Sequence, residues 1–198
     1  MFGFRAGRVK KALARATLGL LARRESDLAR WSDPRNLQAE WDERAAMAAR
    51  HVLPGQPVLD LGCGAMALER FLPPGTPYRP ADIVARRADC LVIDLNRGEF
   101  PEGRFGSVTL LGVLEYLYEP EAVLRRARLA AGRLVLSYAI DLGQKPEKRR
   151  ANGWVNDFKE AEIRRLLEAS GWRLVEQSPI RVRRKVRHDL FVCDDEPG

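Results

Sequence analysis

The 198-residue sequence contains few of the residues that commonly bind metals or form disulfides, with three cysteines and two histidines. Cys63, Cys90 and Cys193 are odd in number, and no two of them have the spacing of metal ligands. This pattern predicts a reducing, cytoplasmic environment in which each thiol packs in the interior rather than reacting, and it predicts no metal site. No apolar run approaches the roughly 20 residues of a membrane-spanning helix, so none is expected.

Acidic residues are absent from the first 24 positions, which contain seven bases. The formal net charge of the whole chain is +7, so the other 27 bases equal the 27 acids in number. Nucleic-acid-binding domains usually have a basic stripe across the folded body. The balanced charge of residues 25–198 therefore argues against a nucleic-acid partner. The seven bases are Arg5, Arg8, Lys10, Lys11, Arg15, Arg23 and Arg24.

Residues 8–22 predict an amphipathic basic helix with an apolar stripe. Three interpretations are open: a helix packed on the domain, a weak and reversible anchor on an anionic membrane, and an organellar transit peptide. Bases interrupt every apolar segment, so a secretory signal is not expected. We expect residues 1–35 to form an N-terminal extension, with 1–24 a peripheral appendage rather than part of the main fold, and residues 36–198 to form the main domain. The stripe consists of Val9, Leu13, Ala16 and Leu20.

The chain is organised around residues 58–67, which read Val-Leu-Asp-Leu-Gly-Cys-Gly-Ala-Met-Ala. A short apolar run that ends in alternating glycines predicts a buried strand, a tight turn and a helix over 66–72. Gly62 permits positive φ, and Gly64 lets a ligand approach the backbone closely. The spacing also fits the dinucleotide fingerprint. However, Asp60 would repel a pyrophosphate, whereas it suits a ligand that carries an ammonium and a sulfonium.

This stretch resembles motif I of the class I S-adenosylmethionine-dependent methyltransferases, which runs roughly L-D-L-G-C-G-x-G. The match holds through Gly64 and departs at Met66, which replaces the third glycine. That glycine mainly permits close packing of helix on strand. We expect the adaptable Met66 side chain to fill a slightly wider gap there and to leave the cofactor site intact. The resemblance also implies cofactor contacts at Cys63, Ile83, Leu95 and Gly112.

Two further acids follow predicted strands. Residues 78–82 predict a second strand that ends in Asp82, 20 residues after Gly62. An acid at that distance accepts hydrogen bonds from ribose hydroxyls with either class of cofactor. Residues 91–95 predict a short third strand that contains Asp94. By the resemblance, Asp94 binds the adenine amino group, with Leu95 packing beside it.

The fourth predicted strand, residues 105–112, is followed by Val-Leu-Glu-Tyr-Leu. In the small-molecule branch of the family this segment often reads V-L-E-H-L, so Tyr116 stands where that histidine would be. The motifs of the DNA base methyltransferases are absent. If a base assists the reaction, the candidates by position are Glu115, Tyr116 and Tyr138, none with a partner visible in the sequence. The catalytic residues are therefore not assigned.

The remaining pattern alternates helices and strands. It predicts a three-layer α/β sandwich of Rossmann-like type, with a mostly parallel seven-stranded sheet and a C-terminal antiparallel hairpin. Ligands bind such sheets at the carboxyl ends of the strands. The predicted helices are 36–50 (capped by Asn36), 121–131 (closed by Gly132) and 158–170; the last strands are 133–139, 172–175 and 189–193, with a long loop at 141–157 and a basic connection at 181–187.

The leading hypothesis is an enzyme that transfers a methyl group from S-adenosylmethionine to a small molecule. The alternatives are a non-catalytic methyltransferase-like binding or assembly module, which the departure at Met66 keeps open, and an NAD-dependent oxidoreductase, which Asp60 disfavours. The acceptor molecule, its reacting atom and the oligomeric state are not determined by the sequence.

Overall fold

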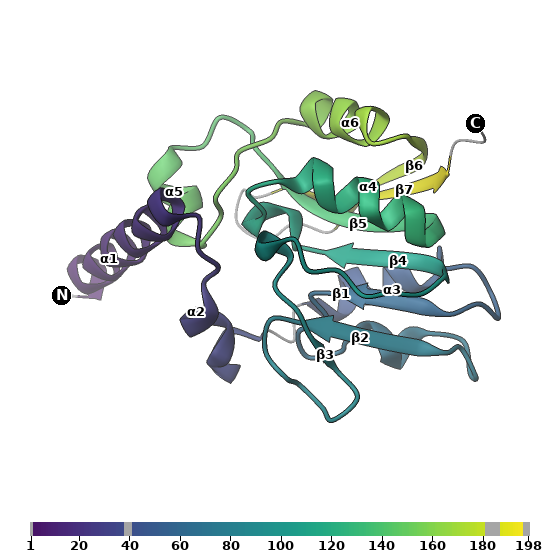
Figure 1. Ribbon diagram of the computed structural model, residues 1–198. Coiled ribbons are helices and arrows are strands. Elements are labelled where there is room, and N and C mark those ends of the chain that lie inside the picture. Colours follow the sequence, from purple (N-terminus) through teal and green to yellow (C-terminus); the bar gives the residue numbers. More distant parts are fainter. Residues whose placement is uncertain (1, 38–40, 181–186, 196–198) are drawn as a thin grey trace.

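The computed structural model describes residues 2–37, 41–180 and 187–195, with side chains from residue 8 onward. A seven-stranded sheet of order β3-β2-β1-β4-β5-β7-β6 forms its centre (Figure 1). The first five strands are mutually parallel, and β7 runs antiparallel between β5 and β6. This confirms the predicted fold class. The strands are β1 Val58–Leu61, β2 Tyr78–Asp82, β3 Leu91–Val92, β4 Phe105–Leu111, β5 Ala131–Ile140, β6 Trp172–Ile180 and β7 Arg187–Asp195.

Helices cover both faces of the sheet and complete the three layers. Helices α4 and α6 pack on one face, over β4, β5 and β6, and α3 packs on the other face against β4 and β5 (Figure 1). The helices are α1 Phe2–Arg23, α2 Leu28–Ser32, α3 Asp42–Ala49, α4 Pro120–Ala130, α5 Pro146–Ala151 and α6 Glu160–Ala169.

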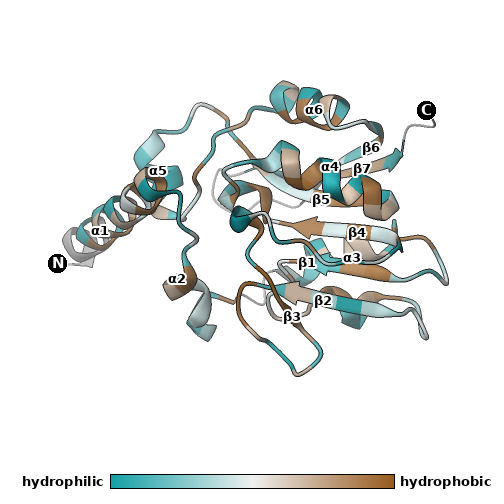
Figure 2. Ribbon diagram, viewed as in Figure 1, coloured by the Kyte–Doolittle hydropathy of each residue, from teal (hydrophilic) through white to brown (hydrophobic). Residues whose placement is uncertain are grey.

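The central strand β5 shows why both faces need cover. Successive side chains of a strand point to opposite faces. Leu134 and Leu136 join the cluster under α4 and α6, whereas Val135 joins the cluster under α3. The strand is therefore buried continuously from Leu134 to Ile140 rather than on alternate residues, as is typical of a sheet that is covered on both sides. Figure 2 shows how hydrophobic and hydrophilic residues are distributed over the elements.

Several predicted elements are shorter or displaced. The predicted helix 66–72 is a turn followed by one 3-10 helix, Leu68–Phe71. Strand β3 stops after two residues because the Asp94 side chain caps the next 3-10 helix, Leu95–Arg97. Gly132 does not close α4, since it lies inside β5. Strands β6 and β7 extend beyond the predicted segments, and residues 181–186 of the basic connection lie outside the described part of the chain.

The predicted helix over 36–50 begins only at Asp42. Asn36 does not cap it, because the Asn36 side-chain amide donates to the Arg30 carbonyl at 2.7 Å. Instead, Asn36 ends a short 3-10 helix, Pro34–Asn36, that follows α2. Trp41 stands at the N-cap position of α3 and makes no side-chain capping bond.

The long segment 141–157, predicted to be a loop, contains α5 and is packed around one buried cation. Arg149 donates from Nε to Asp157 at 2.7 Å and from Nη2 to the Ala139 carbonyl at 3.0 Å. Its guanidinium carbon lies 4.7 Å from the centre of the Trp154 ring. These contacts satisfy the buried charge and hold the segment against β5.

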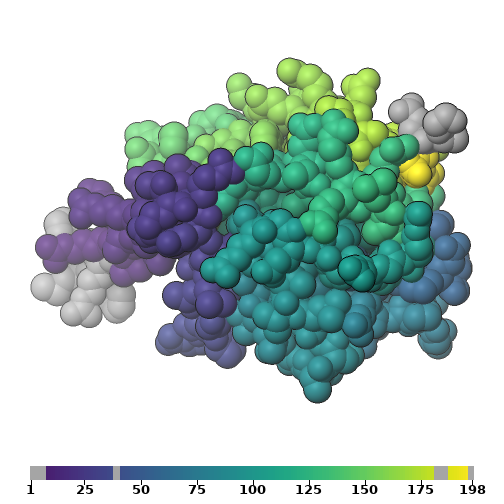
Figure 3. All heavy atoms as spheres, in the orientation of Figure 1, coloured from purple at the N-terminus to yellow at the C-terminus, as the bar shows by residue number. Residues whose placement is uncertain are grey.

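Helix α1 packs against α5 and projects beyond the body of the domain (Figure 3). Among its described side chains, those of residues 8–23, Ala14 and Thr17 are buried. The predicted apolar stripe is largely uncovered, because Val9 and Leu13 are 59% and 39% exposed. The helix thus uses a different face for packing from the one that the sequence pattern indicates.

The turn after β1 contains three residues with positive φ: Gly62 at 72°, Gly64 at 52° and Met66 at 53°. The Met66 amide donates to the Cys63 carbonyl at 2.8 Å, which fixes the turn. A left-handed conformation costs a non-glycine residue roughly 1–2 kcal/mol. From the sequence, the third glycine of the motif is explained by close packing of helix on strand. The positive φ of Met66 at that position is a second reason why a glycine fits there.

We expect Met66→Gly to be more stable than Met66→Ala by about 1 kcal/mol, because both variants lose the same side chain and only glycine adopts positive φ without strain. Urea unfolding measures the difference. The control is Ala67→Gly at a φ of −59°, where glycine should destabilise the protein by roughly 0.5–1 kcal/mol. A Met66→Ala variant as stable as Met66→Gly would contradict this account of the turn.

Candidate functional site

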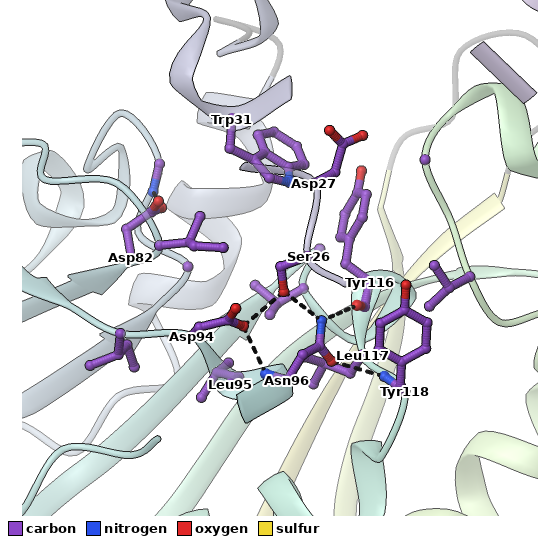
Figure 4. A pocket seen from close by; sticks show the side chains of 18 of the residues that line it. Ser26, Asp27, Trp31, Asp82, Asp94, Leu95, Asn96, Tyr116, Leu117 and Tyr118 are labelled. Carbon is purple, nitrogen blue, oxygen red and sulfur yellow. Dashed lines mark hydrogen bonds between the residues drawn. The ribbon is translucent and has the colours of Figure 1, made fainter. Parts of the chain in front are cut away.

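A pocket that opens to solvent lies at the carboxyl ends of the parallel strands (Figure 4). This is where ligands bind in open α/β sheets. Seven of the predicted cofactor residues line it together: Gly62, Gly64, Asp82, Ile83, Asp94, Leu95 and Gly112. They come from the end of β2 and from the segments that follow β1, β2, β3 and β4.

Asp82 closes the glycine turn. Its Oδ2 accepts from the Gly64 amide at 2.9 Å. Its Oδ1 accepts from the Val84 amide at 3.0 Å and from Arg86 Nη2 at 3.1 Å. The side chain is almost fully buried and faces the pocket (Figure 4). Because a carboxylate has about four acceptor positions, one remains for a ligand in the pocket.

Asp60 lies behind the turn and does not line the main pocket. Its Oδ2 accepts from the Tyr78 hydroxyl and its Oδ1 from the Thr109 hydroxyl, both at 2.6 Å. Burial raises the pKa of Asp60, while the two hydroxyl donors and then Arg44 favour the charged form. Asp60 instead lines a smaller neighbouring cavity with Arg44 and Gly62.

Arg44 of α3 is a site residue that the sequence reasoning missed. It lines both cavities, and its guanidinium carbon lies 5.1 Å from the centre of the Trp41 ring. A side chain at Gly112 would collide with Nη1 of Arg44. Because glycine has no Cβ, the Arg44 guanidinium can lie next to the end of β4. Burial lowers the pKa of Arg44, and Glu115 and Asp60 oppose that shift. Its Nε has no hydrogen-bond partner among the described residues.

Cys63 does not line the main pocket. Its sulfur lies 3.8 Å from that of Cys90, in the interior. Burial raises the pKa of the Cys63 thiol, which favours the unreactive protonated form. The structure therefore places the thiol away from the predicted cofactor contact, although the backbone of Cys63 remains part of the turn.

Only one of the three catalytic candidates lines the pocket. The Tyr116 ring stands edge-on to Trp31, with 5.1 Å between ring centres. Glu115 is buried elsewhere, where its Oε1 accepts from the Ala139 amide at 2.8 Å. The Tyr138 hydroxyl donates to Asn156 Oδ1 at 2.6 Å. Burial raises the pKa of all three groups, so Tyr116 is a hydrogen-bond donor rather than a base near neutral pH.

The N-terminal segment forms part of the pocket wall, which the sequence analysis did not predict. Leu20, residues 25–27 and Trp31 line the pocket opposite the glycine turn. The Trp31 ring lies 6.3 Å from that of Trp41. The expectation that residues 1–24 are a peripheral appendage is therefore wrong for Leu20. The division of the chain at residue 36 stays a prediction.

No group of three or more histidine, cysteine, aspartate or glutamate side chains in the described part of the chain could hold a metal ion. None of the helices described there is both long enough and apolar enough to cross a membrane.

Comparison with known proteins gives no match to any family model or curated protein, but it gives matches to solved structures. One is the 1,6-didemethyltoxoflavin-N1-methyltransferase of Burkholderia thailandensis, bound to its substrate and S-adenosylhomocysteine. It is 18% identical over 80% of each chain, with a TM-score of 0.65. Another is the magnesium protoporphyrin IX methyltransferase of Synechocystis PCC 6803 with bound S-adenosylmethionine, which is 22% identical over 79% of this chain and 78% of that one (TM-score 0.58).

A third similar structure is the [4+2]-cyclase SpnF. It is 12% identical over 79% of this chain and 81% of that one, with a TM-score of 0.64. Identities this low establish the fold and not the activity. The strand order, the antiparallel C-terminal hairpin and these similarities agree: the chain has the fold of the class I S-adenosylmethionine-dependent methyltransferases.

Proposed function

We propose that the protein binds S-adenosylmethionine and transfers its methyl group to a small-molecule acceptor. The observation that carries the proposal is Asp82, which is buried at the end of β2, tied to the glycine turn and left with acceptor capacity toward the pocket. An acid at this place in a βαβ unit binds ribose hydroxyls. The similar structures that contain S-adenosylmethionine or S-adenosylhomocysteine support the same ligand class.

Charge at the glycine turn favours this cofactor over a dinucleotide. The methionine part of S-adenosylmethionine has an ammonium, a carboxylate and a sulfonium. Arg44 has an unpartnered buried Nε and would pair with the carboxylate, while Asp60 behind the turn favours the cationic groups. A pyrophosphate carries negative charge only, so the buried Asp60 behind the turn would disfavour it.

At the opposite end of the proposed site, the adenine would lie among Ile83, Ile93 and Leu95, which line the pocket beside Asp94. These side chains supply apolar surface for the base. The Asp94 carboxylate would accept from the adenine amino group. One end of the pocket thus suits an amino acid and the other suits a nucleobase.

When bound, S-adenosylmethionine supplies an activated methyl group. The protein's task is then to hold an acceptor in line with that methyl. The N-terminal segment and Tyr116 line the same pocket. The Tyr116 hydroxyl donates to the Asn152 carbonyl over a long 3.4 Å, and we propose that it turns to donate to the acceptor instead. The raised pKa of Tyr116 favours an acceptor that needs no strong base.

Two alternative functions would use the same pocket. A non-catalytic module would bind the nucleoside without transferring a methyl group, and SpnF illustrates this fold in a protein described as a cyclase. An oxidoreductase would bind NAD. Binding and turnover measured separately distinguish these three.

We expect calorimetric titration to show binding of S-adenosylmethionine and S-adenosylhomocysteine and no binding of NAD. Asp82→Asn should weaken both interactions by roughly 1.5–3 kcal/mol, the range for a hydrogen bond to a charged group. The control is Asp89→Asn on the same segment, because Asp89 is exposed and pairs with Arg87. Unchanged affinity in Asp82→Asn would remove Asp82 from the site, and tight NAD binding would overturn the proposal.

Arg44 is tested with two ligands that differ only at the amino-acid end. Arg44→Met should weaken S-adenosylhomocysteine binding by roughly 1.5–3 kcal/mol and leave 5′-methylthioadenosine, which has no carboxylate, unaffected. The same calorimetric titrations measure both affinities. Equal weakening of the two ligands would show that Arg44 shapes the pocket without pairing with the carboxylate.

We also propose a weak contact between α1 and an anionic membrane surface. The support is a helix whose Val9, Leu13 and Leu18 side chains are exposed beside Lys10 and Lys11. With three exposed apolar side chains, the contact would be weak and reversible.

Replacing Lys10 and Lys11 by glutamate should weaken binding to phosphatidylserine vesicles by about 2 kcal/mol or more, at about 1 kcal/mol per lost base. Co-sedimentation at low and high salt measures this. The matched control is Arg79→Glu with Arg104→Glu, two exposed bases outside α1. Equal weakening by both pairs, or equal binding to neutral vesicles, would rule out a specific role for α1.

A further inference from the structure

Ser26 connects the N-terminal segment to the adenine end of the proposed site. It lies between α1 and α2, and its hydroxyl donates to Asp94 Oδ1 at 2.7 Å (Figure 4). The same hydroxyl oxygen accepts from Asn96 Nδ2 at 2.9 Å. A donor next to a carboxylate at this distance makes a strong, charge-assisted hydrogen bond.

The direction of these hydrogen bonds follows from Asn96. Its Oδ1 accepts from the Tyr118 amide at 3.0 Å, and its Nδ2 also donates to the Tyr116 carbonyl at 2.9 Å. These two backbone partners fix which end of the amide is nitrogen. The Ser26 hydroxyl therefore receives a hydrogen bond from Asn96, and its single proton points to Asp94.

A separate contact holds Ser26 in place. The Tyr118 hydroxyl donates to the Glu25 carbonyl at 2.9 Å. Arg24, next in the chain, pairs with Glu119. The backbone on the N-terminal side of Ser26 is thus tied to the segment after β4, and the position of the serine does not depend on Asp94 alone.

The consequence is a fixed Asp94 carboxylate. Oδ1 accepts from both the Ser26 hydroxyl and the Asn96 amide, the latter at 3.0 Å. Oδ2 has no such partner among the described residues; Arg97 Nε stands 3.7 Å away on a side chain that is 78% exposed. One oxygen is therefore held by the protein, and the other is left for a ligand.

We propose that Ser26 is a positioning residue that sets the selectivity of the pocket for adenine. By holding Asp94 Oδ1, it presents Oδ2 to the 6-amino group of the base. A hypoxanthine base has a carbonyl oxygen at that position. Because this oxygen and the Asp94 carboxylate are both hydrogen-bond acceptors, they would repel each other. The inference rests on the proposed function, since it requires a nucleoside in this pocket.

The test compares S-adenosylhomocysteine with S-inosylhomocysteine on the same variants, by calorimetry. The wild-type protein should prefer the adenine ligand by about 10- to 150-fold, as expected for a hydrogen bond to a charged group. Ser26→Ala should reduce that preference about fivefold, and Ser26→Thr, which keeps the hydroxyl, should restore it. Because the readout is a ratio within one variant, a general loss of affinity cancels.

Two further variants complete the design. Ser32→Ala, an exposed serine on α2, should keep the wild-type ratio, and Asp94→Asn should abolish it. If the wild-type protein selects adenine and Ser26→Ala keeps the full ratio, Ser26 has no positioning role. If Asp94→Asn keeps the ratio, Asp94 does not bind the base and the inference fails. If the wild-type protein binds neither nucleoside, the proposed function itself fails.

Discussion

The site depends on one hydrogen bond, from the Gly64 amide to the Asp82 carboxylate. The two residues are 18 positions apart, and they meet because β1 and β2 are adjacent parallel strands whose carboxyl ends lie at the same edge. The bond holds the turn over the strand ends. Within the turn, Gly62, Gly64 and Met66 have positive φ values, and the Met66 amide donates to the Cys63 carbonyl.

Around this turn, burial and charge are balanced group by group. The Asp60 carboxylate is buried away from water, but it accepts hydrogen bonds from two hydroxyl groups, and the positive charge of Arg44 lies near it. Removing a charge from water is costly unless such partners replace the water. Arg44 lines both cavities and has a buried Nε without a hydrogen-bond partner among the described residues, and for these two reasons we place the ligand's carboxylate there.

The sequence predicts those parts of the molecule that depend on the local pattern of residues. Strands β1 and β4 follow from apolar runs, and Asp82 at the end of β2 follows from its distance to Gly62. Asp60 was recognised as an acid at the turn, but its burial beneath that turn requires Tyr78 and Thr109, whose approach depends on strand order.

The residues that the sequence did not reveal act through tertiary contacts. Arg44 reaches Gly112 only because α3 packs across the sheet, and Ser26 reaches Asp94 across 68 positions. Arg149 lies in a stretch that resembles a solvated basic loop until β5 and Trp154 enclose it. In each case the neighbouring residues in the sequence give no sign of the role of the side chain, because its contacts are with residues far away in the sequence.

The central claim is that this pocket binds the whole of S-adenosylmethionine, from amino acid to adenine. A crystal structure of the complex with S-adenosylhomocysteine tests it most directly. The account predicts the ribose hydroxyls on Asp82, the carboxylate on Arg44 and the adenine amino group on Asp94. A nucleoside bound elsewhere, or a Met66 side chain that fills the space of the methionine moiety, would contradict it.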